Sequence, residues 1–132
     1  MTIGTWEPEP QKPQSPDTAT LQIFLALSDE QFENIAAHLD TGLIERNQFL
    51  MKLDLDAWQT VAGSLDDNAI RRLVRFFTLA EEQLPGWEAQ DRSPVIWLCK
   101  ILKQRGQFPD KELTRWIKAH SKNRFLPYGS VL

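Results

Sequence analysis

The most constraining feature of this sequence is the apolar run SPVIWLCKILKQR, which begins at Ser93. Serine followed by proline is typical of a helix start, because the serine side chain accepts a hydrogen bond from an early backbone N–H and proline suits the first helical position. Apolar side chains then cover almost the whole circumference, interrupted early only by Lys100 and Lys103. A helix that is apolar all round is a buried helix. A buried strand is the alternative for so short a run, but the cap and the Gly106 stop favour a helix.

Helical patterns also occupy the rest of the chain after residue 16. Ser28 and Gln31 form a capping-box pattern before an apolar stripe of helical period, and Gly42 is expected to end that helix. Aspartates are expected to cap later helices at Asp54 or Asp56 and at Asp66 or Asp67. No segment alternates with period two for long enough to predict a strand. We therefore predict an all-α fold, a compact bundle of six or seven helices formed by residues 17–132 as a single domain.

An internal similarity suggests that part of this bundle is repeated. A shift of 26 residues places Leu27 to Leu53 on Leu53 to Leu79, with identities that include Asp40 with Asp66 and Arg46 with Arg72. Such a pattern is typical of two stacked helix-pair repeats that share a core. The alternative is that any two capped amphipathic helices match to this extent by their common template.

The first sixteen residues differ from the rest in composition. Prolines at positions 8, 10, 13 and 16 prevent helix and ladder formation, so we predict a flexible Pro-rich N-terminal arm over residues 1–16. The arm lacks the basic and apolar regions of a signal peptide, and no 18-residue apolar run predicts a membrane span. Cys99 is the one cysteine of the chain, which rules out an intramolecular disulfide. A reducing, cytoplasmic location is the simplest expectation, with no membrane association.

Charge is distributed unevenly along the chain, although the net charge is only −3. Residues 1–70 carry twelve acidic and three basic residues, whereas residues 93–132 carry eight basic and two acidic residues. One interpretation is a basic surface for an anionic partner. The other, which the sequence favours, is that the two halves attract each other within one fold.

Residue patterns for catalysis or metal binding are absent from the sequence. His38, His120 and Cys99 are isolated from one another and lack the spacing of a metal site. The glycines are not grouped as in a phosphate-binding loop. Cys99 lies between apolar neighbours and is expected to be a buried thiol, and His120 ends an apolar stripe at the edge of the core. The acidic residues stand at predicted helix starts, where capping accounts for them. We therefore expect a protein that is not an enzyme and needs no metal and no cofactor.

The strongest functional signal lies in the last predicted helix and the tail. Basic residues recur there at i, i+4, i+7 and i+11, opposite an apolar stripe, and the tail is unusually apolar. The predicted partner-binding residues are Lys111, Arg115, Lys118, Lys122, Arg124, Phe125 and Tyr128. This pattern suggests a non-catalytic protein-interaction or adaptor domain that contacts an acidic protein surface. A solvated helix face and a tail that packs on the core are the plain alternatives.

The same basic surface also suits a second hypothesis. A nucleic-acid-binding protein would use the stripe for phosphates, with Trp87 or Tyr128 as stacking groups. The acidic pI of about 5.4 counts against it. The apolar tail would also suit a homodimer, so the oligomeric state stays open.

Overall fold

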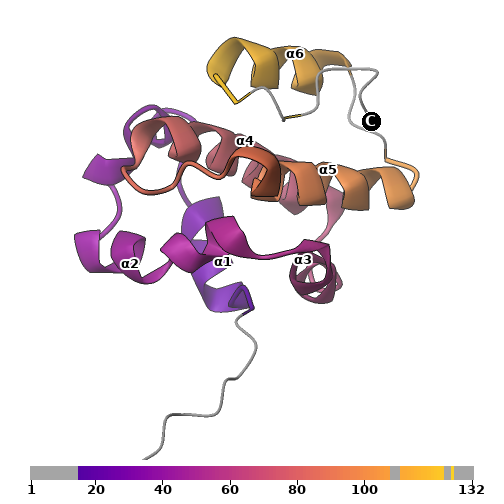
Figure 1. The fold of residues 1–132 in the computed structure, drawn as a ribbon, viewed down its shortest axis with the longest axis horizontal. Coiled ribbons are helices and arrows are strands. Elements are labelled where there is room, and N and C mark those ends of the chain that lie inside the picture. The colour runs from indigo at the N-terminus through magenta and orange to yellow at the C-terminus, as the bar shows by residue number, and fades with distance from the viewer. Residues whose placement is uncertain (1–14, 108–110, 124–125, 127–132) are drawn as a thin grey trace, which may run out of the picture.

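Helices alone build the described part of this protein. The computed structural model describes residues 15–107, 111–123 and 126 of the 132-residue chain. These residues contain no strand, and the predicted all-α bundle is confirmed (Figure 1). The α-helices are α1 (Thr18–Leu25), α2 (Thr41–Arg46), α3 (Leu55–Ala62), α4 (Asp67–Gln83), α5 (Pro94–Gln104) and α6 (Lys111–His120). The 3-10 helices are η1 (Gln31–Ala37), η2 (Gln48–Lys52) and η3 (Gln90–Arg92).

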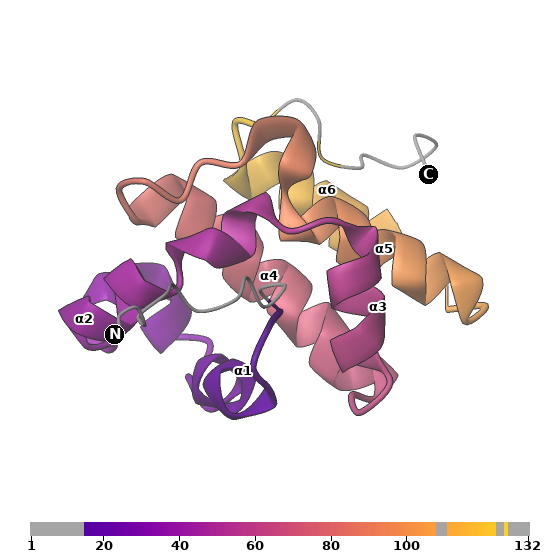
Figure 2. The ribbon, with the colours of Figure 1, turned by 60° about the horizontal axis from the view of Figure 1, so that its bottom comes forward.

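The longest helix, α4, packs against more of the other elements than any other helix does. It contacts α5, α1, η1 and α6, whereas α5 packs chiefly against α4 and α3. In Figures 1 and 2, α4 and α5 run through the middle of the molecule with α1 and α3 on one side and α6 on the other. The expectation that α5 is enclosed all round is only partly correct, because Ile96 and Trp97 are half-buried.

Aromatic rings from four segments form the centre of the core. Phe24 of α1 stacks on Phe76 of α4 with ring centroids 4.2 Å apart, and Trp58 meets Phe77 edge to face at 5.4 Å. Such contacts add to the large apolar area that aromatic side chains bury. Trp87 is fully buried and stacks on Phe77 at 6.4 Å.

The burial of Trp87 corrects the hypothesis that it is a stacking group for nucleic acid. Gly86 adopts a positive φ of 84°, a conformation that glycine reaches without steric cost. The chain thereby turns back after α4, and the Trp87 backbone N–H donates to the Leu84 carbonyl at 3.1 Å. The indole is thus placed in the core and is not available to stack on a nucleic-acid base.

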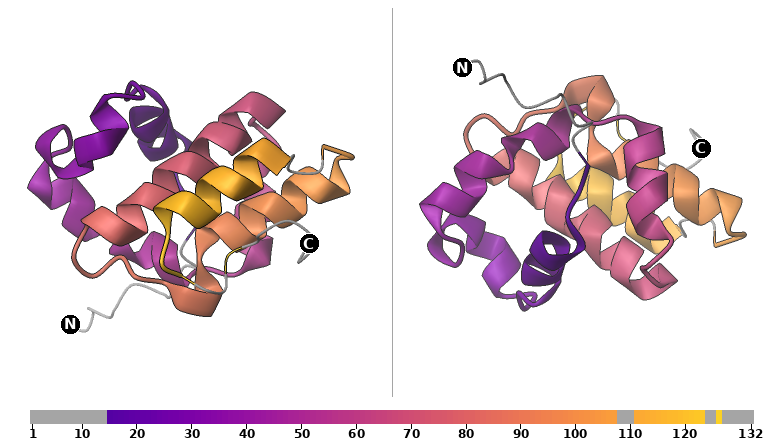
Figure 3. Two further views of the ribbon diagram at one scale, coloured as in Figure 1. Left: turned by 90° about the horizontal axis from the view of Figure 1, so that it is seen from above. Right: turned by 90° about the horizontal axis from the view of Figure 1, so that it is seen from below.

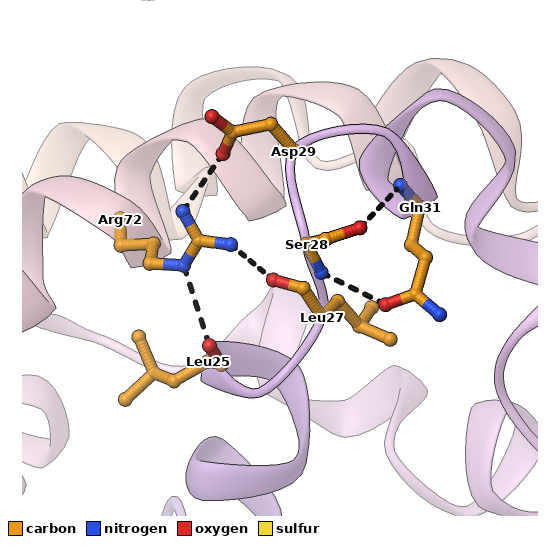
Figure 4. A network of polar contacts seen from close by, with 6 residues as sticks. All are labelled: Leu25, Leu27, Ser28, Asp29, Gln31 and Arg72. Carbon is orange, nitrogen blue, oxygen red and sulfur yellow. Dashed lines mark hydrogen bonds and ion pairs between the residues drawn. The ribbon is translucent and has the colours of Figure 1, made fainter.

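Most of the predicted helix caps are present. Asp54 accepts from the Ala57 N–H at 3.2 Å, and Asp66 accepts from the Ala69 N–H at 2.8 Å. Ser93 caps α5 by accepting from the Val95 N–H, and Gly106 ends this helix with a φ of 76°. The capping box at residues 28–31 is also formed, with both reciprocal hydrogen bonds in place (Figure 4). Side chains that bond to nearby backbone are set by local sequence, so they were predictable.

The helix predicted after the capping box is wrong in type. η1 is a 3-10 helix whose Asn34 has non-helical dihedral angles (φ −147°, ψ 72°). The side chain of Gln83 from α4 donates to the Phe32 carbonyl and accepts from the Ile35 N–H, each at 2.8 Å. These tertiary hydrogen bonds satisfy backbone groups that a regular α-helix would pair internally, and thus compensate for the interruption at Asn34.

Two boundaries in the first half of the chain also differ from the prediction. Gly42 does not end a helix but lies in the first turn of α2, which Asp40 caps through the Leu43 N–H at 3.1 Å. The Ser15-Pro16 dipeptide is typical of a helix start and predicted Ser15 as the first cap, but Asp17 caps α1. Asp40 and Asp66, paired by the 26-residue shift, are both N-caps, but they precede helices of 6 and 17 residues. The repeat hypothesis therefore stays a prediction.

Arginine side chains join α4 and α5 to the ends of earlier helices. Arg72 donates to the carbonyls of Leu25 and Leu27 and pairs with Asp29 at 2.8 Å (Figure 4). The Arg72 guanidinium also lies 4.6 Å from the ring centroid of Phe32. Helix ends leave carbonyls without intrahelical partners, and a guanidinium with five donors can satisfy several of them.

Arg105 makes a similar set of contacts at the end of α3. It donates to the Ala62 carbonyl at 2.6 Å and to the Leu65 carbonyl at 3.0 Å, and it pairs with Asp67 at 3.0 Å. We refer to these two groups of contacts as the Arg72 clamp and the Arg105 clamp.

Candidate functional site

The helix α6 has two chemically different faces. Leu113, Thr114 and Ile117 are buried against the rest of the fold. Seen from above in Figure 3, α6 lies over α4 and α5, which places its opposite face toward solvent. The sequence prediction of an amphipathic last helix is therefore correct, and the charged side of this helix is exposed.

Four of the predicted partner-binding residues lie in the described chain and are exposed. Lys111, Arg115 and Lys118 belong to α6, and Lys122 follows its end. The backbone N–H of Lys122 donates to Glu82 at 2.9 Å, which anchors the end of the helix to α4. Arg124, Phe125 and Tyr128 lie outside the described residues. Leu126 is described and is 1% exposed, so the tail contacts the core at that position.

The exposed cations of α6 form no ion pair with residues that the structure describes. In the described ranges, the ion pairs are Arg72 with Asp29 and Arg105 with Asp67. Of these, the Arg105 pair joins the basic C-terminal part to the acidic N-terminal part. The favoured interpretation of the charge asymmetry, attraction between the two halves, thus accounts for Arg105 but not for Arg115 or Lys118.

A groove beside α6 brings together residues that the sequence analysis did not connect. Its volume is about 460 Å³, and its walls come from the start of η1, one face of α4 and the inner edge of α6. The lining residues are Asp29, Phe32, Glu33, Arg75, Leu79, Gln83, Trp116 and His120. Positions 75, 79 and 83 recur every four residues and so share one face of α4. We call this hollow the α4–α6 groove.

Arg75 is the charged group on the α4 side of the α4–α6 groove. Its guanidinium carbon lies 5.8 Å from the ring centroid of Trp116. Its Nε is buried and has no hydrogen-bond partner among the described residues, and the side chain forms no ion pair with them. A buried donor without an acceptor is costly. Because Arg75 lines the groove and forms no ion pair with the described residues, its guanidinium is the group with which a carboxylate in the groove would pair.

The α6 wall of the groove is a stacked pair of rings. Trp116 and His120 lie 4.3 Å apart between centroids, with planes inclined by 22°. The His120 Nδ1 lies 2.7 Å from the Trp116 carbonyl, which can only accept, so Nδ1 carries the proton and donates. His120 is exposed rather than set in the core edge, because the helix turns it into the groove mouth.

A buried carboxylate stands behind the end of α6. Glu81 is 6% exposed and accepts hydrogen bonds from the Ser93 hydroxyl, from Asn123 Nδ2 at 3.1 Å and from the Ala89 N–H at 3.4 Å. Burial raises the pKa of Glu81 above its ordinary value of 4.5, although these hydrogen bonds act in the opposite direction. Glu81 therefore ties α4 to the start of α5 and to the segment that follows α6.

The remaining sequence candidates for chemistry are separated in the structure. Cys99 is buried, and burial raises the pKa of its thiol to about 12, so the thiol is protonated at neutral pH. Within the described ranges, no three His, Cys, Asp or Glu side chains are grouped to hold a metal ion. None of the described helices is long and apolar enough to span a membrane.

Comparison with known proteins adds no relative to this description. A scan against protein-family models finds no match, and searches of curated proteins and of solved structures find none either. The exposed face of α6 and the α4–α6 groove are therefore interpreted from their own chemistry.

The groove could not be predicted from the sequence, because its walls come from segments far apart in the chain. Asp29 and Glu33 precede Arg75 by more than forty residues, and Trp116 follows it by about as many. The one available signal was Arg75 itself, a cation next to the apolar stripe of α4. That position alone does not distinguish a groove residue from an ordinary surface arginine.

Proposed function

We propose that this protein is a non-catalytic protein-interaction domain that binds an acidic surface of a partner protein through the exposed basic face of α6. One observation carries the proposal: Lys111, Arg115 and Lys118 are exposed on one helix face and lack ion pairs with the described residues. Several cations on one face of a rigid helix steer an oppositely charged partner and fix its orientation.

The anchoring of α6 supports this role. Leu113 and Ile117 are buried, and Glu82 holds the backbone of Lys122 at the end of the helix. The basic face is consequently presented by a packed helix rather than by a loop, which lowers the entropy cost of binding. The buried, protonated thiol of Cys99 is compatible with the reducing cytoplasm that we propose as the location of the protein.

The test is a capture experiment with the full chain, carrying an N-terminal tag so that Leu132 remains free. The double variant R115E/K118E reverses two charges on the basic face and should lose the partner proteins that the wild type retains from a native lysate. The matched control is R46E/K52E, which makes the same charge change at exposed positions of α2 and η2. Far-UV circular dichroism should show unchanged helix content in both variants.

Equal capture by R115E/K118E and the wild type would refute the assignment of this face. Treatment with nuclease separates the second hypothesis, since partner proteins should stay bound while nucleic acid would be removed. A log-linear fall of affinity with salt together with loss on nuclease treatment would favour nucleic-acid binding instead. The burial of Trp87 already removes one of its two expected stacking groups.

A further inference from the structure

The α4–α6 groove contains the guanidinium of Arg75, which is not fully hydrogen-bonded, beside an apolar and aromatic surface. Arg75 has five donors, and its buried Nε lacks an acceptor among the described residues. Phe32, Leu79 and Trp116 supply the adjacent apolar lining. Sites that bind organic ligands or side chains combine such a lining with a small number of polar groups that fix orientation.

We propose that the α4–α6 groove binds one acidic side chain of the partner protein, flanked by an apolar residue, with its carboxylate paired to Arg75. A guanidinium and a carboxylate match in a bidentate geometry, which makes this the strongest pairing open to Arg75. The apolar neighbour of the acidic residue covers Leu79 and Phe32. This inference rests on the proposed function, because it assigns a specific contact to the same acidic partner.

The other charges of the groove limit the occupant to a single negative charge. Asp29 is already paired with Arg72 at 2.8 Å, which leaves Glu33 as the acidic group without an ion pair in the described chain. Glu33 repels a second carboxylate and any phosphate that would enter the same space. The groove therefore suits an isolated Asp or Glu among apolar residues, and it does not suit a polyanion.

The helix α6 links this groove to the basic face. Trp116 and His120 form the groove wall, while Arg115 and Lys118 lie on the exposed side of the same helix. A partner that contacts the basic face and inserts one acidic side chain beside Trp116 would contact α6 on two sides. The groove contact adds specificity, because it requires that the acidic residue of the partner has an apolar neighbour. The basic face requires only that the partner surface is negatively charged.

The experiment uses the full chain and two synthetic peptides, acetyl-Leu-Glu-Leu-amide and acetyl-Leu-Gln-Leu-amide. Binding is followed by the indole N–H signal of Trp116 in ¹H–¹⁵N correlation spectra, which the W116F variant identifies among the five tryptophans. The Glu peptide should shift this signal saturably, and the Gln peptide should bind at least about tenfold more weakly, since it lacks the charged acceptor.

Variants of the protein then test the roles of the two charged groups. R75Q should weaken binding of the Glu peptide more than about tenfold, and E33Q should strengthen it about threefold. R71Q is the matched control, because Arg71 lies one turn earlier on α4, bonds to Gln107 and does not line the groove. If R75Q does not fold, R75K keeps the charge but loses the bidentate fork, and should bind several-fold more weakly.

The failure of this inference is distinguishable from failure of the proposed function. Equal shifts with both peptides, or no effect of R75Q and R75K, would overturn the groove assignment even if R115E/K118E abolished capture. A Glu-specific shift that R75Q removes would uphold the groove even if R115E/K118E captured the partner normally. A stronger response to a poly-Glu peptide than to the single Glu peptide would contradict the role given to Glu33.

Discussion

The two arginine clamps and the basic face of α6 use the same kind of side chain in opposite ways. Arg72 and Arg105 each donate to two backbone carbonyls and to an aspartate, so their charges are paired within the fold. Arg115 and its neighbours on α6 are exposed and have no ion pair with the described residues. The distribution of charge along a sequence therefore does not indicate a binding surface until the charges that are paired within the fold have been subtracted.

The clamps also differ from the α6 cations in what surrounds them. The side chains of Arg72 and Arg105 are 30% and 29% exposed, and their aspartates are 80% and 34% exposed. Ion pairs this exposed contribute little by themselves. The bonds to backbone carbonyls at and just after the ends of α1 and α3 matter more, because a hydrogen bond from a charged donor contributes more than an exposed ion pair. Four variants test this contrast, in order of decreasing effect.

Replacing Arg72 should have the largest effect. Arg72→Ala removes the donors to Leu25 and Leu27, the pair with Asp29 and the contact with the Phe32 ring. We expect the free energy of unfolding to fall by about 3 kcal/mol, measured by urea titration. Arg72→Lys, which keeps the charge but not the fork, should recover less than half of this loss. A loss no larger than that of an exposed α6 cation would contradict the clamp interpretation.

Replacing Arg105 should have a smaller effect of the same kind. Arg105→Ala leaves the carbonyls of Ala62 and Leu65 without this donor, but no aromatic contact is lost as it is with Arg72. The expected decrease in the free energy of unfolding is about 2 kcal/mol by the same titration. Asp67→Asn serves as the control, since it removes the ion pair and the negative charge in the first turn of α4 but leaves both carbonyl bonds of Arg105 in place, and it should cost less than about 1 kcal/mol.

Glu81 presents the converse case, a buried carboxyl group that forms no ion pair with the described residues. Its pKa is raised in the folded protein, so between 4.5 and the folded value the native state holds more protons than the unfolded state. The free energy of unfolding should therefore fall as the pH rises through that interval and level off above it. Glu81→Gln removes the titration, so its pH profile should be flatter there than that of the wild type.

Thermal or urea unfolding at a series of pH values checks the Glu81 prediction. The charged residues that line the same hollow as Glu81 are Glu82, Glu88 and Lys122. Glu88→Gln, at an exposed position, is the control and should leave the wild-type pH profile unchanged. Parallel profiles for the wild type and Glu81→Gln would show that the buried carboxylate has no raised pKa.

Replacing the cations of α6 should have the smallest effect on stability. Arg115→Ala combined with Lys118→Ala removes two exposed side chains that form no ion pair with the described residues. The free energy of unfolding should change by less than about 0.5 kcal/mol, while capture of an acidic partner is lost. A destabilisation comparable with that of Arg105→Ala would mean that this face belongs to the fold rather than to an interface.

Local sequence alone determined the helix starts, because each cap bonds to backbone two or three residues away. Ser93 and the capping box at residues 28–31 act as predicted. Asp54 and Asp66 are the caps within the predicted alternatives, Asp54 or Asp56 and Asp66 or Asp67. The amphipathic pattern of α6 likewise predicted which of its faces is exposed. The all-α class follows from such periodicity, which requires no knowledge of distant contacts.

Tertiary structure decided the features that depend on residues far apart in the chain. The side chain of Gln83 hydrogen-bonds to backbone groups of η1 that lie 48 or more residues away in the sequence. No local pattern could therefore distinguish η1 from an α-helix. Arg72, Arg75 and Arg115 are all arginines within helices, and the sequence does not distinguish their roles. Only the packing makes Arg72 part of a clamp, Arg75 a groove donor and Arg115 an exposed cation. The physical reason is that local chemistry sets which groups a residue offers, whereas the fold decides which of them remain unsatisfied.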